Sequence, residues 1–227
     1  MIYLTGRQRL LTAVTLAGLL VMMIPGAAFA VDTFRLQVGL GAHGGDPDIE
    51  FAGESGSLDT DTGIAISAGG WIDHVGWNHF SLGLEYLRLQ DSDFHASASA
   101  TFLGGTLTGT LDIEPTIDAV MVNAAMRNND GTIHPYIGGG IGVGHADVDL
   151  TASVTVTVGG QTFSASGSAN DTDTAFAGQL FGGIDVDIGG NWYLGVNGRY
   201  FLMDADLFGA DVEFRNWALM GFIGRKF

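Results

Sequence analysis

Strict alternation between apolar and small or polar residues recurs along this chain and limits its fold more than any other feature. In one such stretch Trp192, Leu194 and Val196 occupy even positions, whereas the odd positions include Asn197 and Arg199. Because successive side chains of a strand point to opposite faces of a sheet, each stretch predicts a β-strand with one apolar face. Eight strands are predicted, over residues 34–43, 64–73, 79–89, 119–127, 136–144, 177–187, 192–203 and 214–227.

The links between these strands alternate between short and long. Short turns are predicted around residues 76–78, 128–131 and 189–191, and the long links are residues 43–62, 90–114, 145–173 and 203–213. Short turns at one end and long loops at the other are typical of transmembrane β-barrels with an even number of strands. Two long links turn again, at Gly104-Gly105 and Gly159-Gly160, between alternating Thr, Ser and Ala residues. These hairpin strands are expected to continue beyond the membrane.

The two faces of the strands distinguish a membrane barrel from a soluble one. A soluble lipocalin-type barrel has its apolar face inside and presents polar residues to water. Here the face rich in Leu, Val, Tyr and Trp is continuous and uncharged over about ten residues. We therefore predict an all-β fold, an eight-stranded antiparallel up-and-down transmembrane β-barrel. In residues 64–73 and 214–227 both faces look apolar, so their lipid-facing sides are left open.

The polar face contains charged groups that the barrel must hold inside. An eight-stranded barrel has interior room only for side chains. Gly accounts for 36 of the 227 residues and frees volume for Arg35, Glu85, Asn123, Gln179 and Arg199. A buried charge needs a partner, so we expect Glu85 to form an ion pair with Arg199 or Arg35.

The first 30 residues have the pattern of a secretory signal peptide. Arg7 and Arg9 precede an apolar run over residues 10–24, and Ala28-Phe29-Ala30 is a cleavage pattern. The run is shorter than the ~20 residues of a transmembrane helix, the competing interpretation. The predicted organisation is therefore a signal peptide, 1–30, and a barrel domain, 31–227. Loss of Arg7 and Arg9 would make the exported chain more acidic than its net charge of −16.

Three motifs carry a resemblance to a known family. Residues 135–144 read Pro-Tyr-Ile-Gly-Gly-Gly-Ile-Gly-Val-Gly, and residues 82–86 read Leu-Gly-Leu-Glu-Tyr. The terminal Phe227 shares its parity with Ile223 and Leu219, and Arg225 interrupts that series. Together they resemble the eight-stranded outer-membrane barrels of the opacity, surface-antigen and outer-membrane protein A type.

The resemblance implies a location and a set of partners. It places the chain in the outer membrane of a Gram-negative bacterium, with both termini in the periplasm and with lipid and lipopolysaccharide around it. It also implies that the barrel-assembly machinery recognises Phe227. The family supplies no catalytic residues to transfer, and a monomer is expected.

Composition and spacing argue against enzyme and nucleic-acid functions. The absence of Cys excludes thiolate metal sites and Cys nucleophiles, and 9 Lys and Arg against 25 acids disfavour phosphate binding. Residues 39–44 match a dinucleotide fingerprint only by spelling, because no helix pattern follows. His79, Ser81 and Glu85 share one strand face, but Glu85 lies about 13 Å from Ser81, too far for a triad. No catalytic, cofactor or metal residue is therefore predicted.

Acidic residues are concentrated in the four long links, which contain no Lys or Arg. Many occur as Asp-x-Asp, whose carboxylates share a strand face and could hold a divalent cation, although solvated loop acids are the preferred interpretation. The pairs are Asp46/Asp48, Asp59/Asp61, Asp91/Asp93, Asp147/Asp149, Asp171/Asp173, Asp185/Asp187 and Asp204/Asp206.

The expected function follows from two features. The long links form a rim with acidic residues but no Lys or Arg, and side chains fill the lumen of the barrel. A structural or surface-antigen role in envelope integrity is preferred. An adhesin or receptor that binds through the long loops is the alternative, a small pore is less favoured, and a lipid-modifying enzyme comes last.

Overall fold

The computed structural model describes residues 33–45, 48–51, 54–57, 62–75, 79–90, 94–102 and 104–227. The expected leader, residues 1–30, lies outside them. All regular elements are strands, and no helix of the described residues is long and apolar enough to cross a membrane. The strands are β1 (Thr33–Gly45), β2 (Asp48–Phe51), β3 (Glu54–Ser57), β4 (Gly63–Asp73), β5 (Phe80–Gln90), β6 (Phe94–Phe102), β7 (Gly105–Arg127), β8 (Ile133–Val158), β9 (Gln161–Gly189), β10 (Trp192–Leu207) and β11 (Ala210–Lys226).

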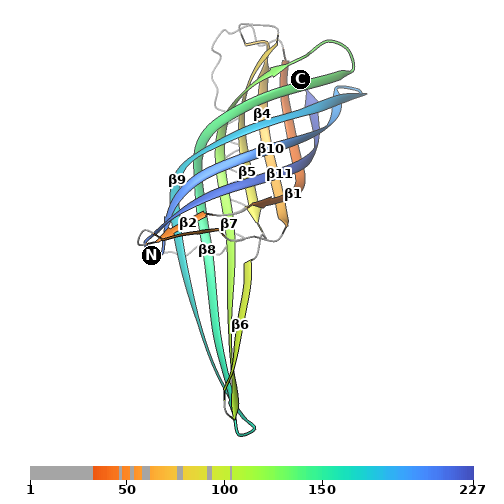
Figure 1. Ribbon diagram of the computed structural model, residues 1–227. Helices are drawn as coiled ribbons and strands as arrows, with labels where there is room; N and C mark the ends of the chain where they lie inside the picture. Colours follow the sequence, from red (N-terminus) through yellow and green to blue (C-terminus); the bar gives the residue numbers. More distant parts are fainter. Residues whose placement is uncertain are drawn as a thin grey trace, which may run out of the picture.

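Eight of these strands form a closed ring (Figure 1). Each pairs antiparallel with its neighbours in the order β1-β4-β5-β7-β8-β9-β10-β11, and β11 pairs back with β1. The predicted eight-stranded up-and-down barrel is therefore confirmed, and each predicted strand lies on one of these eight. The sequence did not separate β2, β3 and β6, which extend the sheet beside β11 and β7.

The two ends of the barrel differ as expected. At the end that holds Thr33 and Phe227, here called the terminal end, the turns are short, and Gly131, Gly189 and Gly190 adopt positive φ angles. The chain ends seal the ring there, since the Phe227 amide donates to the Phe34 carbonyl oxygen at 2.8 Å. The opposite end, here called the long-loop end, carries the predicted hairpin turns at Gly104 and at Gly159-Gly160.

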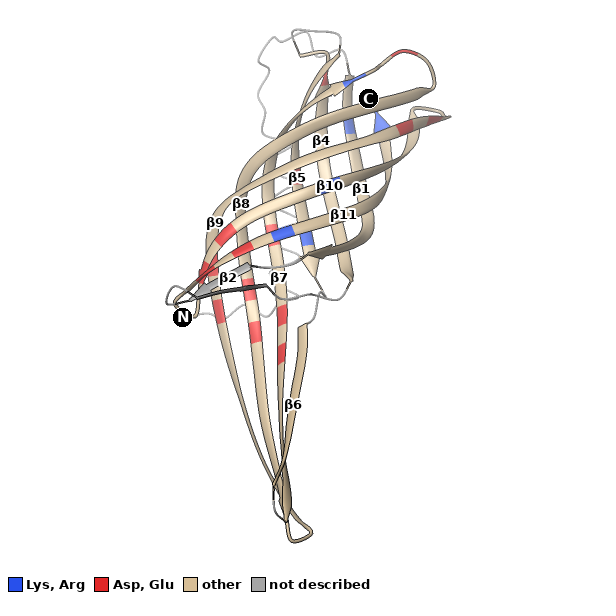
Figure 2. Ribbon diagram, in the orientation of Figure 1, with Lys and Arg blue, Asp and Glu red and all other residues tan. Residues whose placement is uncertain are grey.

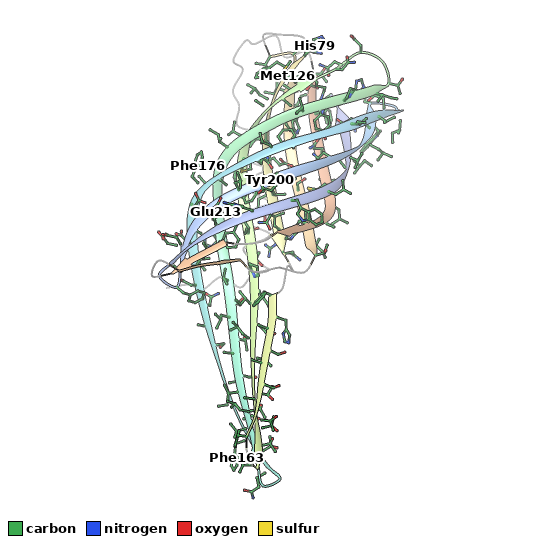
Figure 3. The ribbon with its side chains drawn as sticks, viewed as in Figure 1. His79, Met126, Phe163, Phe176, Tyr200 and Glu213 are labelled. Atoms are coloured by element: carbon green, nitrogen blue, oxygen red, sulfur yellow. The ribbon has the colours of Figure 1, made fainter. Side chains whose placement is uncertain are left out.

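Three ring strands, β7, β8 and β9, continue far beyond the ring at the long-loop end, and β6 lies beside β7 there (Figure 1). We call this part the projecting sheet: β6 with residues 105–113, 150–158 and 161–169 of β7, β8 and β9. Its strands pair in the order β6-β7-β8-β9, and Phe163 marks its tip in Figure 3. The links predicted over residues 90–114 and 145–173 are thus mostly strand rather than loop.

The structure settles the side-chain parity that the sequence left open. In β4, Ala65, Ser67 and Trp71 are buried in the barrel, whereas Ile64 and Ile66 are exposed outside. In β11 the even-numbered residues from Val212 to Gly224 face inward. Leu219, Ile223 and Phe227, which share one parity, are therefore on the outer side of the barrel.

The interior is less uniformly polar than the sequence suggested. Large apolar side chains fill its long-loop half, where Leu87, Met121, Phe201, Met203 and Met220 form one buried cluster. Polar residues are concentrated toward the terminal end. The prediction of a small and polar inward face came from the centres of the strands. Near the long loops, the inward residues of the same strands are large and apolar instead.

Candidate functional site

An ion-pair network closes the terminal half of the lumen. The Arg35 guanidinium donates to both carboxylate oxygens of Asp73, at 2.6 and 2.9 Å, and lies 3.4 Å from Asp185. Arg127 donates to the same Asp185 oxygen at 2.5 Å. Arg35 is 1% exposed, so these charges cross the barrel out of contact with water.

A second network lies deeper in the barrel, around Glu85. Arg199 donates to Glu85 Oε1 at 3.0 Å, while Asn123 and Gln179 donate to Oε2 at 2.9 and 3.2 Å. The predicted Glu85–Arg199 ion pair is confirmed, and Arg35 pairs with Asp73 and Asp185 instead. Four strands, β5, β7, β9 and β10, supply this network, which therefore ties opposite walls of the barrel together.

Glycine at the paired position of the neighbouring strand makes room for these polar side chains, as predicted. A Cβ on Gly195 would overlap the Asp185 carboxylate, and one on Gly140 would overlap the Asn123 amide oxygen. A side chain at either position would enter the lumen. Larger side chains there would displace the networks.

The structure does not assemble the His79, Ser81 and Glu85 combination into a catalytic site. The Ser81 hydroxyl donates to Asp73 at 2.6 Å, and His79 Nδ1 lies 3.1 Å from the Arg127 carbonyl oxygen. His79 sits at the terminal end in Figure 3. The dinucleotide-like stretch, residues 39–44, lies within β1 and opens no helix.

Acidic residues form a belt at the long-loop end of the apolar band, and Figure 2 shows in red where they lie on the strands. On β7 and β8 the last apolar row contains Val120 and Val143, and the next outward row contains Asp118 and His145. This acidic belt comprises Asp112, Glu114, Asp118, Asp147, Asp149, Asp204, Asp206, Asp211 and Glu213.

Two arginines stand within the belt, just outside the windows in which the sequence contained no cation. Arg88 lies 3.4 Å from Asp118, and Arg215 donates to Glu213 at 2.7 and 2.8 Å. The Tyr86 hydroxyl also donates to Asp118. The rim is therefore strongly acidic but carries two fixed positive groups.

Several Asp-x-Asp pairs are held by protein donors rather than simply solvated. The Asn170 amide donates to both Asp147 and Asp149, at 2.7 and 2.9 Å. Asp185 is buried in the lumen, and Asp187 contacts Lys226 at 2.6 Å. Asp46/Asp48, Asp59/Asp61 and Asp91/Asp93 fall wholly or partly outside the described side chains. Among the residues described, no group of three or more His, Asp or Glu has the arrangement of a metal site.

Beyond Met203, where β10 no longer pairs with β9, two Asp side chains of β9 accept hydrogen bonds from backbone amides of the β10–β11 hairpin. Asp173 accepts from the Asp206 amide at 2.8 Å, and Asp171 accepts from the Phe208 amide at 2.6 Å. Hydrogen bonds from the amides of Asp206 and Thr174 lower the pKa of Asp173. A hydrogen bond and charge repulsion from Asp211 raise the pKa of Asp206.

Comparison with known proteins identifies the family of this chain. A family model, the outer membrane protein beta-barrel domain, matches residues 14–221. The chain belongs to this outer-membrane β-barrel family. Members are bacterial outer-membrane proteins, so the apolar outer face is the lipid-facing band. No curated protein sequence matches the chain.

Solved structures share the fold at low sequence identity. Neisserial surface protein A is 13% identical, with a TM-score of 0.51, over 86% of this chain and 97% of that chain. Ail, the attachment invasion locus protein of Yersinia pestis, is 14% identical, with a TM-score of 0.43, over 85% of this chain and 98% of its own. OprG from Pseudomonas aeruginosa is 16% identical, with a TM-score of 0.47, over 86% of this chain and 95% of its own.

Proposed function

We propose that this outer-membrane barrel is a closed anchor that displays the projecting sheet and the acidic belt at the cell surface, with a structural or surface-antigen role and no catalytic one. The buried ion-pair networks across the lumen carry this proposal. Arg35, Asp185 and Arg199 are each at most 5% exposed, so transport through the lumen would require these pairs to break. Separating a buried pair costs about 3–5 kcal/mol.

The lipid-facing band has the height that a membrane requires. On β10 the band runs from Trp192 to Leu202, and Asp204 follows it. Eleven residues at ~3.3 Å each, tilted by about 45°, rise about 25 Å, which matches the apolar band of outer-membrane barrels. Because outer-membrane barrels have short periplasmic turns and longer extracellular loops, we assign the short turns and both chain ends to the periplasm and the acidic belt and projecting sheet to the outside. Exposed acids beside anionic lipopolysaccharide would require bridging Mg²⁺ or Ca²⁺.

Two measurements test this proposal. Planar-bilayer recordings of refolded protein should show no stepwise conductance, and regular single-channel steps would overturn the closed-anchor assignment. Protease added to intact cells should cleave within the projecting sheet while leaving the barrel intact. Cleavage only after the outer membrane is permeabilised would overturn the orientation.

An adhesin is the second candidate, and the acidic belt favours it. The belt is an extended, predominantly acidic surface that would attract cationic ligands over about 8 Å at physiological salt, despite Arg88 and Arg215 within it. Charge-neutralising changes, Asp147→Asn with Asp149→Asn, should reduce binding of a cationic peptide such as polylysine without affecting assembly. Unchanged binding that stays insensitive to salt would remove this candidate.

A further inference from the structure

The projecting sheet has two faces of opposite chemistry. Cross-strand partners share a face, as Leu111 does with Ala96 on β6 and with Ala152 on β8. This apolar face consists of even-numbered residues 94–102 and 150–158 and odd-numbered residues 105–113 and 163–169, and each is Ala, Gly, Val, Leu, Ile or Phe. The other face is mainly Ser and Thr, with Asp112 at its base.

The apolar face is exposed over most of its length. Phe163 is 62% exposed, Phe102 is 47% exposed and Val154 is 46% exposed. Within the described part of the chain, no second layer of strands lies over it (Figure 1). A sheet with one hydrophobic face is stable when that face is buried against another element. Contiguous apolar patches beyond a few hundred Å² mark interaction sites.

The size of the face is sufficient for a stable interface with a like face. Four strands about 4.8 Å apart span about 19 Å, and nine residues at ~3.3 Å span about 30 Å. Each copy would then contribute on the order of 600 Å² in plan, and two copies about 1,200 Å². Specific interfaces begin at about this total area.

The charge distribution directs a second copy to this face rather than to the rest of the surface. The chain carries a net charge of −16, so most of its exposed surface repels another copy. The apolar face lacks Asp, Glu, Lys and Arg, and two such faces meet without repulsion. The acidic residues nearby lie on the opposite face or at its base. A self-complementary patch is also what a two-fold symmetric dimer requires.

We propose that the apolar face of the projecting sheet binds the same face of a second copy of this chain. The two sheets pack face to face about 10 Å apart, with Leu107, Leu111 and Val156 in the shared core. This proposed dimer differs from the monomer expected from the sequence. It rests on the proposed display of the projecting sheet outside the membrane.

Matched glutamate substitutions on the two faces test the dimer. Val154→Glu places a charge at the centre of the apolar face, and Thr155→Glu places the same charge on the opposite face of the same strand. In sedimentation equilibrium of detergent-refolded full chain, wild type and Thr155→Glu should be dimeric at tens of micromolar. Val154→Glu should raise the dimer dissociation constant at least tenfold, and heat-modifiable gel migration should show that all three are folded. A monomeric wild type, or equal effects of both substitutions, would overturn the proposal.

Single cysteines provide a second readout in a chain that contains none. Ala152→Cys lies on the apolar face and should form an intermolecular disulfide under mild oxidation, whereas its neighbour Ser153→Cys should not. Equal cross-linking at both positions would contradict the face-to-face arrangement. Monomeric wild type that, when reconstituted in one set of vesicles, bound a second, protein-free set and lost this binding in Val154→Glu but not in Thr155→Glu would assign the apolar face to lipid instead. Surface proteolysis tests the proposed display independently, because an exposed but monomeric sheet refutes only the dimer.

Discussion

The barrel wall and the projecting sheet are built from the same long strands, yet their apolar sides are opposite. Along β7 the outward face changes from Val122 in the lipid-facing band to Thr110 in the projecting sheet, while the inward face changes from Asn123 to Leu111. The strand continues without a break, so the surroundings and not the backbone dictate the pattern. An apolar exterior is stable in lipid, and beyond the lipid the exterior must be polar.

The acidic belt lies where this reversal takes place. Asp112, Glu114 and Asp118 fall between the two patterns on β7, and Asp147 and Asp149 do so on β8. Charged residues are costly within hydrocarbon and favourable in water, so they fix how far each strand enters the membrane. The belt thus separates a region stabilised by lipid from the region for which we propose a protein partner.

The strongest test of this division compares the loss of one residue from the barrel seam with the loss of many from the projecting sheet. Deleting Phe227 removes the backbone hydrogen bonds and the ring contact with Phe34 that seal β1 to β11, and it removes the expected assembly signal. Assembled protein in outer-membrane fractions should fall severalfold. Replacing residues 151–169 by a short Gly-containing turn should leave assembly near the wild-type level. Equal losses would show that the two regions fold as one unit.

The lumen should be the next most sensitive region. Arg35→Ala leaves Asp73 buried without its main cation, and the expected loss in unfolding free energy is about 3–5 kcal/mol. Urea unfolding in detergent, followed by tryptophan fluorescence, measures it. The control Arg215→Ala breaks an exposed pair with Glu213 and should cost at most about 1 kcal/mol. Comparable losses would contradict the structural role of the lumen network.

One strand can report on both regions through the same substitution. Val122→Arg puts a cation on the lipid-facing side of β7 and should destabilise the protein by about 2–4 kcal/mol. Thr110→Arg places it on the same side in the projecting sheet, where the expected change is within about 0.5 kcal/mol. Urea unfolding of protein reconstituted in lipid vesicles measures both variants. Equal destabilisation by Val122→Arg and Thr110→Arg would disprove the reversal of environment along β7.

The smallest expected effect concerns pH at the β10–β11 hairpin. The pKa of Asp206 is raised by Asp211, so the protonated form is favoured on folding, and this contribution is lost as pH rises through the raised pKa. Asp206→Asn should therefore slow exchange of the hairpin amides at neutral pH relative to wild type, and the difference should vanish in acid. Asp173 behaves oppositely, because its pKa is lowered and its contribution is lost as pH falls. Hydrogen exchange at both pH values measures each variant, and an Asp206→Asn effect that persisted in acid would show that charge repulsion from Asp211 is not its cause.

The sequence predicts the barrel well because period-2 alternation is a local signal. Each of the eight predicted strands falls on a strand of the ring, and the Glu85–Arg199 pair follows from the need to neutralise buried charge. Side-chain parity in β4 and β11 could not be obtained this way, since Trp71 and Phe222 are apolar residues that face the lumen. Their placement depends on long-range register.

The apolar face of the projecting sheet was visible in the sequence but not interpreted. Leu107, Leu111 and Ile113 alternate with Thr and Asp as regularly as the barrel strands do. The Thr, Ser and Ala content suggested only that strands continue above the membrane. That β6, β7, β8 and β9 align their apolar residues on one side depends on pairing between distant segments, which one sequence does not report.

The position of the charges along the projecting sheet has a consequence for biogenesis. From Phe94 to Leu111 and from Leu150 to Asn170 the chain contains no Asp, Glu, Lys or Arg, and the carboxylates begin only at the base of the sheet. In the proposed orientation these hairpins cross the bilayer tip first as the barrel forms. We expect the leading segments to cross without moving a fixed charge through hydrocarbon, and the acids to arrive last, so that once outside they prevent the strands from sliding back.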